Sequence, residues 1–161
     1  MRLRTHVFVS TGIALGVVVF DRLTKIIFSD ILTVGESILV VKNIFHITLV
    51  HNTGIAFGLF KDSGAVFIIV PMVVVVAMGV YVYRHRKQSN FAGLPLGALA
   101  LISGGALGNL IDRIMFGHVI DFLDFRVWPV FNVADSAITI GMVMVIIDHM
   151  IQHRSSAKPL S

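Results

Sequence analysis

Long apolar runs dominate this chain and divide it into four segments, each about as long as a membrane-spanning helix. A bilayer core about 30 Å thick is crossed by roughly 20 apolar residues in a helix. The first run carries charged residues near its end, whereas the second and third runs carry none. We therefore expect four transmembrane helices, at about residues 7–28, 64–83, 93–111 and 132–151.

A different pattern fills about residues 30–60, between the first two runs. The stretches ESILV and FHITLV alternate in part between apolar and polar residues, and Gly35-Glu36 and Lys42-Asn43 are typical of turns. This pattern predicts a small sheet. Because open sheet edges are not tolerated in hydrocarbon, we expect the sheet at the membrane surface. Residues 112–131, between the last two runs, are expected on the same side of the membrane, and the 14-residue gap between Asp121 and Asp135 is expected to form an interfacial loop.

The composition agrees with an integral membrane protein. Of 161 residues, 56% are hydrophobic and only 14% are charged, and the mean hydropathy is +0.89. Soluble domains carry about 25% charged residues. At this length a single domain covering residues 1–161 is expected. The absence of cysteine excludes disulfides, thiolate metal sites and a cysteine nucleophile.

Charge placement predicts the orientation in the membrane. The N-terminal tail, the loop after the second run and the C-terminal tail hold seven of the 13 basic residues and no acidic ones. Basic residues favour the cytoplasmic side of short loops. With four spans all three segments fall on one side, so both termini are expected in the cytoplasm. The seven residues are Arg2, Arg4, Arg84, Arg86, Lys87, Arg154 and Lys158.

Two aspartates stand out in the opposite half of the molecule. Asp121 and Asp135 lie in apolar and aromatic surroundings, and a carboxylate beside hydrocarbon is by default a candidate functional residue. If the two meet, repulsion keeps one proton on the pair. The ionised member can then deprotonate a water, and the protonated member can polarise a peptide carbonyl. Alternatively, Asp135 is a first-turn acid of the fourth helix. Asp124 is a rival for Asp121, although its neighbour Arg126 favours a solvated interfacial charge.

Other polar residues gather in the same half, each with a structural alternative. Asn52, Asn109 and Asn132 suit substrate binding or orientation of the aspartates, but asparagine also favours turns and caps. Asp112 and Arg113 end the third run and are candidate site residues; alternatively Arg113 pairs with an outer carboxylate, or the two form a helix-end charge pair. Asp21 and Lys25, spaced i and i+4, favour a structural ion pair over catalysis. Gly104 and Gly108 have the spacing that lets membrane helices pack closely.

Absent motifs narrow the chemistry. No HExxH occurs among the scattered histidines, so no metal site is expected, and no GxSG or GxGD protease motif occurs. No feature predicts a cofactor or a nucleic-acid partner. The main alternative to an enzyme is a small proton-coupled transporter with intramembrane carboxylates. It predicts carboxylates at all depths, whereas eight of the nine acidic residues fall in the outer half and only Asp148 lies towards the other end. A non-catalytic scaffold would not need the aspartates.

The motifs DRLTK, NTGIAFG, GGALGNLIDR, VIDF and FNVADS occur in this order between residues 21 and 141. In this combination the chain resembles the lipoprotein signal peptidase (signal peptidase II) family. The resemblance implies four transmembrane helices with a small extracytoplasmic β-cradle in the bacterial cytoplasmic (inner) membrane. It implies an aspartyl endopeptidase that cleaves prolipoproteins just before a diacylglyceryl-modified cysteine and that is sensitive to globomycin. We expect a monomer among membrane lipids, with its active site at the extracytoplasmic face.

The resemblance also assigns roles to residues. It implies Asp121 and Asp135 as the catalytic pair. It implies a supporting polar set around that pair and a structural pair on the first helix. The supporting set is Asn52, Gly54, Asn109, Asp112, Arg113 and Asn132, and the structural pair is Asp21 and Lys25.

Overall fold

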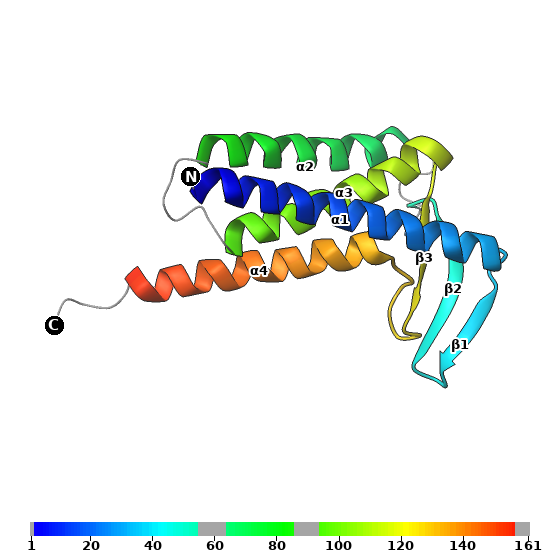
Figure 1. Ribbon diagram of the computed structural model, residues 1–161. Coiled ribbons are helices and arrows are strands. Elements are labelled where there is room, and N and C mark those ends of the chain that lie inside the picture. Colours follow the sequence, from blue (N-terminus) through cyan, green and yellow to red (C-terminus); the bar gives the residue numbers. More distant parts are fainter. Residues whose placement is uncertain (1, 55–63, 86–93, 157–161) are drawn as a thin grey trace.

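The computed structural model describes residues 2–54, 64–85 and 94–156 (Figure 1). Within these residues the chain forms four helices and one three-stranded sheet. The helices are α1 (Arg2–Ile31), α2 (Gly64–His85), α3 (Leu94–Phe116) and α4 (Val133–Ser156), and the strands are β1 (Ser37–Val41), β2 (Phe45–Asn52) and β3 (Val119–Asp124).

Helix α3 is the centre of the bundle and packs against α1, α2 and α4. Small residues on α3 let the neighbouring helices approach closely, as the spacing of Gly104 and Gly108 predicts. A β-carbon at Gly104 would lie 2.7 Å from the carbonyl oxygen of Ala14 on α1. Among the described residues three helices contain stretches long and apolar enough to cross a membrane, Val7–Ile31, Leu94–Phe116 and Val133–Gln152. In α2 the corresponding apolar stretch, Pro71–Arg84, is shorter.

The order of the helices brings the sheet and four helix ends together. The end of α1, the start of α2, the end of α3 and the start of α4 lie at the same end of the bundle as the sheet (Figure 1). The start of α1 and the end of α4 lie at the other end. The strands are antiparallel in the order β1-β2-β3 and run across the helix axes rather than along them.

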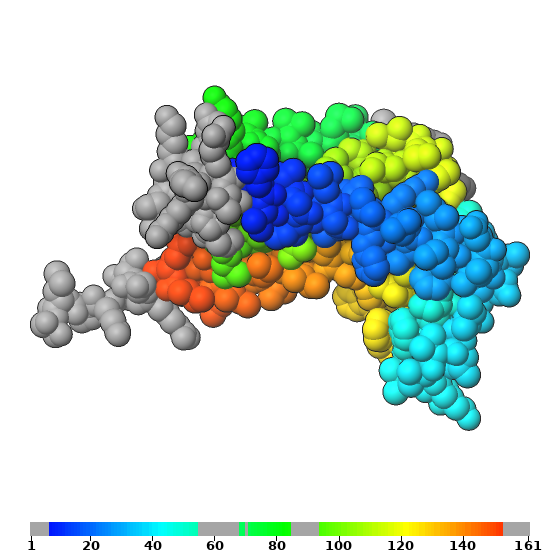
Figure 2. Space-filling view, viewed as in Figure 1, coloured from blue at the N-terminus to red at the C-terminus, as the bar shows by residue number. Residues whose placement is uncertain are grey.

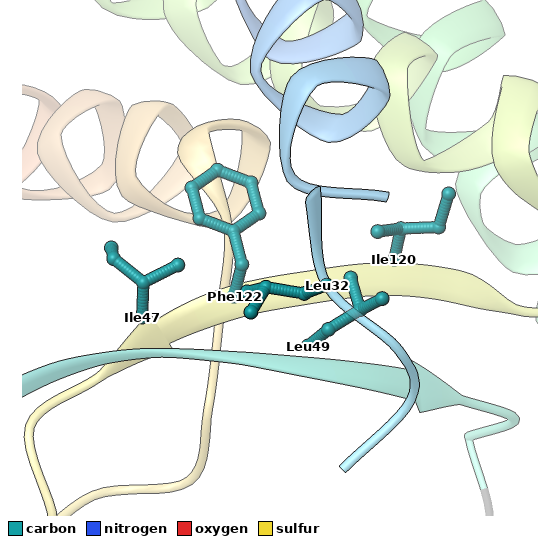
Figure 3. Packing of buried hydrophobic residues seen from close by; sticks show 5 residues of the cluster. All are labelled: Leu32, Ile47, Leu49, Ile120 and Phe122. Atoms are coloured by element: carbon teal, nitrogen blue, oxygen red, sulfur yellow. The ribbon is translucent and has the colours of Figure 1, made fainter. Parts of the chain in front are cut away.

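An apolar cluster joins the sheet to α1. It contains Leu32, Ile47, Leu49, Ile120 and Phe122, all at most 7% exposed (Figure 3). These side chains lie between the strands and the helices. The ring of Phe28 on α1 packs against that of Phe122, with 4.6 Å between the ring centroids. Strand β1, by contrast, is exposed along its whole length. The β1–β2 hairpin projects beyond the bundle as a separate lobe (Figure 2).

The expected fold class, a helical membrane protein with a small sheet, is confirmed. Both expected strands and both turns of the 30–60 segment form. Strand β3 was not expected, and because it continues to Asp124 and α4 begins at Val133, only part of the gap between Asp121 and Asp135 is a loop. VIDFLD gave little strand signal, since aspartate is depleted in strands and five of its six residues are buried without alternation. Residues 55–60 of the expected β-rich segment, Asp62, Arg86, Lys87 and Lys158 lie outside the described residues.

Candidate active site

Strand β3 places the carboxylate of Asp121 in the interior, where the residue is 1% exposed. Its neighbours Ile120 and Phe122 enter the apolar cluster, so Asp121 points to the other face of the sheet. The register sets Asp121 opposite Val50, which makes Asn52 its diagonal neighbour on the same face. Asn52 Nδ2 donates to Asp121 Oδ2 at 2.8 Å.

The first turn of α4 presents Asp135. Its Oδ1 accepts a hydrogen bond from Asn109 Nδ2 at 2.7 Å, and its Oδ2 accepts the backbone N–H of Asn132 at 3.3 Å. In return the N–H of Asp135 donates to Asn132 Oδ1 at 2.9 Å. This reciprocal pair is the capping-box arrangement. Asp135 is therefore a first-turn acid, as one interpretation of the sequence expected, and a member of a polar network as well.

Asn132 connects the two aspartates. It is fully buried, and its Nδ2 lies 2.7 Å from Asp121 Oδ1 and 3.0 Å from Asn109 Oδ1. Asn109 in turn donates to Asp135. Carboxylates on β3 and α4 thus enter one hydrogen-bonded network through a pair of asparagines.

Each of the three asparagines has its amide orientation fixed by a donor to its oxygen. Asn132 Oδ1 accepts the N–H of Asp135, and Asn109 Oδ1 accepts from Lys25 Nζ at 3.1 Å. Asn52 Oδ1 accepts the N–H of Gly54 at 2.9 Å. Gly54 has a φ of +77°, a conformation that glycine adopts without strain. Every NH2 group is consequently turned towards Asp121 or Asp135.

Next to this network lies an ion cluster of buried Asp21, Lys25 and Asp112 with the partly exposed Arg22. Lys25 is fully buried, and its Nζ lies 2.8 Å from Asp21 Oδ2 and 2.7 Å from Asp112 Oδ2. Arg22 donates to Asp112 Oδ1 at 2.9 Å. The predicted Asp21–Lys25 ion pair is confirmed. Asp112 forms ion pairs with Arg22 and Lys25 of α1, and it also interacts electrostatically with Arg113.

Two arginines flank the network. Arg113 donates to the carbonyl oxygen of Asn109 at 3.3 Å and interacts electrostatically with Asp135 and Asp121. Arg22 was given no role from the sequence, although a charged residue near the end of an apolar run is itself a signal. Throughout the described part of the chain, every buried side-chain nitrogen and oxygen has a partner.

Asp124 does not belong to the network. It accepts hydrogen bonds from Thr48 Oγ1 at 2.8 Å and from the guanidinium of Arg126 at 3.0 Å. The expectation of a solvated charge is wrong, because Asp124 is only 4% exposed. Burial alone would raise its pKa, but the hydrogen bonds from Thr48 and from the backbone and side chain of Arg126 outweigh burial and lower the pKa. Such a carboxyl stays ionised, which suits a structural role.

Asp121 has the opposite electrostatics. Burial raises the pKa of Asp121 from its ordinary 3.8 to about 6, and repulsion from Asp135 adds to this effect. The hydrogen bonds from Asn52 and Asn132 and the charge of Lys25 lower the pKa, but burial prevails. A carboxyl with a pKa near the operating pH can hold or release a proton during a reaction.

The arrangement therefore offers two carboxyl groups for acid–base chemistry. No group of three or more potential metal ligands occurs among the described residues. A carboxyl with a raised pKa and a second carboxyl at a helix N-terminus share one hydrogen-bonded network.

Comparison with solved structures identifies the class of protein. The chain is similar to a bacterial membrane enzyme solved by the in meso method at 2.3 Å resolution, with a TM-score of 0.81, 34% identity and coverage of 95% of this chain and 93% of that chain. A second bacterial membrane enzyme, solved at 1.9 Å, gives a TM-score of 0.78 and 36% identity over 86% of this chain and 90% of that one. The fold is that of a multi-pass bacterial membrane enzyme.

Sequence comparison identifies the family. The lipoprotein signal peptidase of Halothermothrix orenii is 43% identical over 84% of this chain and 90% of its own length, and that of Cupriavidus pinatubonensis is 44% identical over 85% and 80%. The family model of signal peptidase (SPase) II matches residues 13–151. The chain belongs to the signal peptidase II family, and thus to the membrane proteases that remove signal peptides from prolipoproteins. The transporter alternative is not supported.

Proposed function

We propose that this chain is an aspartic endopeptidase that cleaves prolipoproteins immediately before the diacylglyceryl-modified cysteine, with Asp121 and Asp135 as its catalytic pair. The observation that carries the proposal is the position of Asn132. Its side chain donates to Asp121 while its backbone and side chain cap Asp135, so one buried residue holds both carboxylates.

The mechanism follows from the two environments. Asp121, with its raised pKa, holds the shared proton. Asp135 acts as the base, with its carboxylate at the N-terminus of α4 and hydrogen-bonded by the amide of Asn109. Asp135 takes a proton from a water, and the water oxygen attacks the scissile carbonyl carbon. Asp121 gives its proton to the carbonyl oxygen, and the tetrahedral gem-diol forms.

Collapse of the gem-diol completes hydrolysis. Asp135 delivers its proton to the nitrogen of the leaving amine, the C–N bond breaks, and the carbonyl reforms as a hydroxyl proton returns to Asp121. The pair then has its starting proton again. No covalent intermediate and no cofactor enters these steps.

The substrate chemistry fits the position of the network. Asp135 lies at the start of an apolar helix, and Asp121 lies in the sheet at the same end of the bundle. A diacylglyceryl cysteine sits at a membrane interface, with its acyl chains in hydrocarbon. Both carboxylates at the extracytoplasmic interface, with both termini in the cytoplasm, would meet that peptide bond where it emerges.

The test is cleavage of a diacylglyceryl-modified prolipoprotein by purified enzyme in detergent. Asp121→Asn and Asp135→Asn should each lower kcat by roughly 10²–10⁴-fold, the usual contribution of a general acid or base. Asp124→Asn is the matched control, since Asp124 lies on the same strand but outside the network, and it should retain most activity. Substantial cleavage by Asp121→Asn or Asp135→Asn would reject the mechanism. Globomycin should protect the wild type from thermal unfolding.

A further inference from the structure

A carboxylate from α1 caps the first turn of helix α4. Asp21 Oδ1 accepts the backbone N–H of Ala134 at 2.9 Å. The first N–H groups of a helix have no partner within the helix, so Asp21 acts as a cap supplied from another element. Ala134 directly precedes Asp135. The position of Asp21 therefore sets where the first turn of α4, and with it Asp135, begins.

The other aspartate is held in a matching way. Asp112 on α3 accepts the backbone N–H of Ile120 at 3.1 Å, through its Oδ2. Ile120 directly precedes Asp121. Each member of the proposed catalytic pair is thus anchored one residue upstream, and the anchor in both cases is a buried carboxylate of the ion cluster.

Lys25 joins the two anchors. Its ammonium group lies within 2.8 Å of Asp21 Oδ2 and 2.7 Å of Asp112 Oδ2, and it donates to Asn109 Oδ1 at 3.1 Å. The last contact fixes the amide of Asn109 with its NH2 towards Asp135. Burying such charges is expensive, and an apolar replacement of a buried ion pair is often as stable. The stability of the fold alone therefore does not explain why a buried lysine occupies position 25.

We propose that Lys25 is the positioning residue of the aspartate pair. It holds Asp21 and Asp112 at a fixed separation, and through their backbone contacts it sets the placement of Asp135 and Asp121 relative to each other. The inference rests on the proposed function, because it concerns the geometry of that pair. A misplacement of about 1 Å in a catalytic group can lower a rate by about 10²-fold.

The experiment separates positioning from charge balance. Lys25→Met alone leaves Asp21 without its cation and is expected to unfold readily. The double variant Asp21→Asn/Lys25→Met removes one charge of each sign, so that Arg22 and Asp112 remain as a neutral pair. It should fold, bind substrate with a KM within a few-fold of wild type, and lose about 10²-fold in kcat. Lys42→Met, in the exposed β1–β2 turn, is the control and should leave both constants unchanged.

Four further variants, two at each aspartate, test the anchors. Asp21→Asn and Asp112→Asn keep an oxygen that can accept the N–H of Ala134 or Ile120, whereas Asp21→Ala and Asp112→Ala keep none. The Asn variants should retain clearly more activity than the Ala variants, and Asp112→Ala should also shift the pH profile of kcat. If Asp21 and Asp112 had only a structural role, their substitution would change thermal stability but neither the pH profile nor the ratio of kcat to KM.

The outcomes distinguish the two proposals. Wild-type kcat in the folded double variant, or equal losses in Asn and Ala variants, would overturn the role of Lys25 while leaving the aspartate pair intact. Activity in Asp121→Asn or Asp135→Asn would reject the proposed function itself. If the double variant does not fold, the Asn and Ala comparison at position 112, with Lys25 and Asp21 in place, decides alone.

Discussion

Gly108 on α3 lies against the carboxylate of Asp21 on α1, so closely that a β-carbon at position 108 would come within 2.8 Å of Asp21 Oδ2. The same carboxylate binds Lys25 and caps α4. Gly108→Ala should therefore displace Asp21 and lower kcat by up to roughly 10²-fold. Overpacking should also destabilise the fold by about 1–3 kcal/mol.

Gly97→Ala is the control for this substitution. Gly97 lies on the same helix, and a β-carbon there would make an ordinary contact of 3.7 Å with Met144. It should change neither activity in the prolipoprotein assay nor the thermal unfolding midpoint appreciably. Equal activity of the two alanine variants would show that the space at Gly108 is not needed.

How much of this site could be predicted from sequence depends on the range of the contacts. The i, i+4 pair Asp21–Lys25 is local and was predictable. The four helices and two of the strands follow from hydrophobic pattern. The contact of Asp112 with Lys25 joins distant elements, and backbone groups such as the N–H of Ala134 carry no sequence signal. Strand β3 was not predicted, because both of its faces are buried and its sequence therefore does not alternate between apolar and polar residues.

A left-handed backbone position tests the role of the Asn52 amide. Gly54, with a φ of +77°, donates to Asn52 Oδ1, and Gly35, with a φ of +88°, lies in the turn before β1. Alanine at either position should lower stability by about 1–2 kcal/mol. Only Gly54→Ala should also reduce prolipoprotein cleavage, because Asn52 then loses its orientation towards Asp121. Equal activity losses in both variants would point to instability alone.

The pH profile should report the proton on Asp121. Burial raises its pKa to about 6, so kcat/KM should fall as the pH rises through this value and the shared proton is lost. Asn52→Ala removes a hydrogen bond that lowers the pKa of Asp121, so its alkaline limb should move to higher pH. Asp124→Asn should leave the limb in place. A shift to lower pH in Asn52→Ala would contradict this assignment.

Stability should depend on pH with opposite signs at two aspartates of β3. Folding raises the pKa of Asp121 from 3.8 to about 6, which disfavours the folded state by up to about 3 kcal/mol above that pKa. This penalty disappears as the pH falls to about 4. Relative to wild type, Asp121→Asn should therefore be more stable at about pH 7 than at about pH 4.

Asp124 supplies the reversed control. Its pKa is lowered in the folded protein, so its ionised form stabilises the fold at neutral pH and that contribution is lost in acid. Relative to wild type, Asp124→Asn should be less stable at neutral pH than in acid. Thermal unfolding in detergent at both pH values measures the two differences. The same sign for both variants would show that the two carboxyls do not differ as described.

The single tryptophan allows a direct test of membrane placement. Trp128 follows β3 and is 69% exposed, beside Val127 at 92%, in a protein that spans a bilayer. Tryptophan is enriched at membrane–water interfaces. In right-side-out vesicles its fluorescence should be quenched by external iodide and by lipids brominated near the headgroup, and only weakly by lipids brominated deep in the acyl chain. Quenching from the lumen alone would place the site on the cytoplasmic face and reverse the proposed orientation.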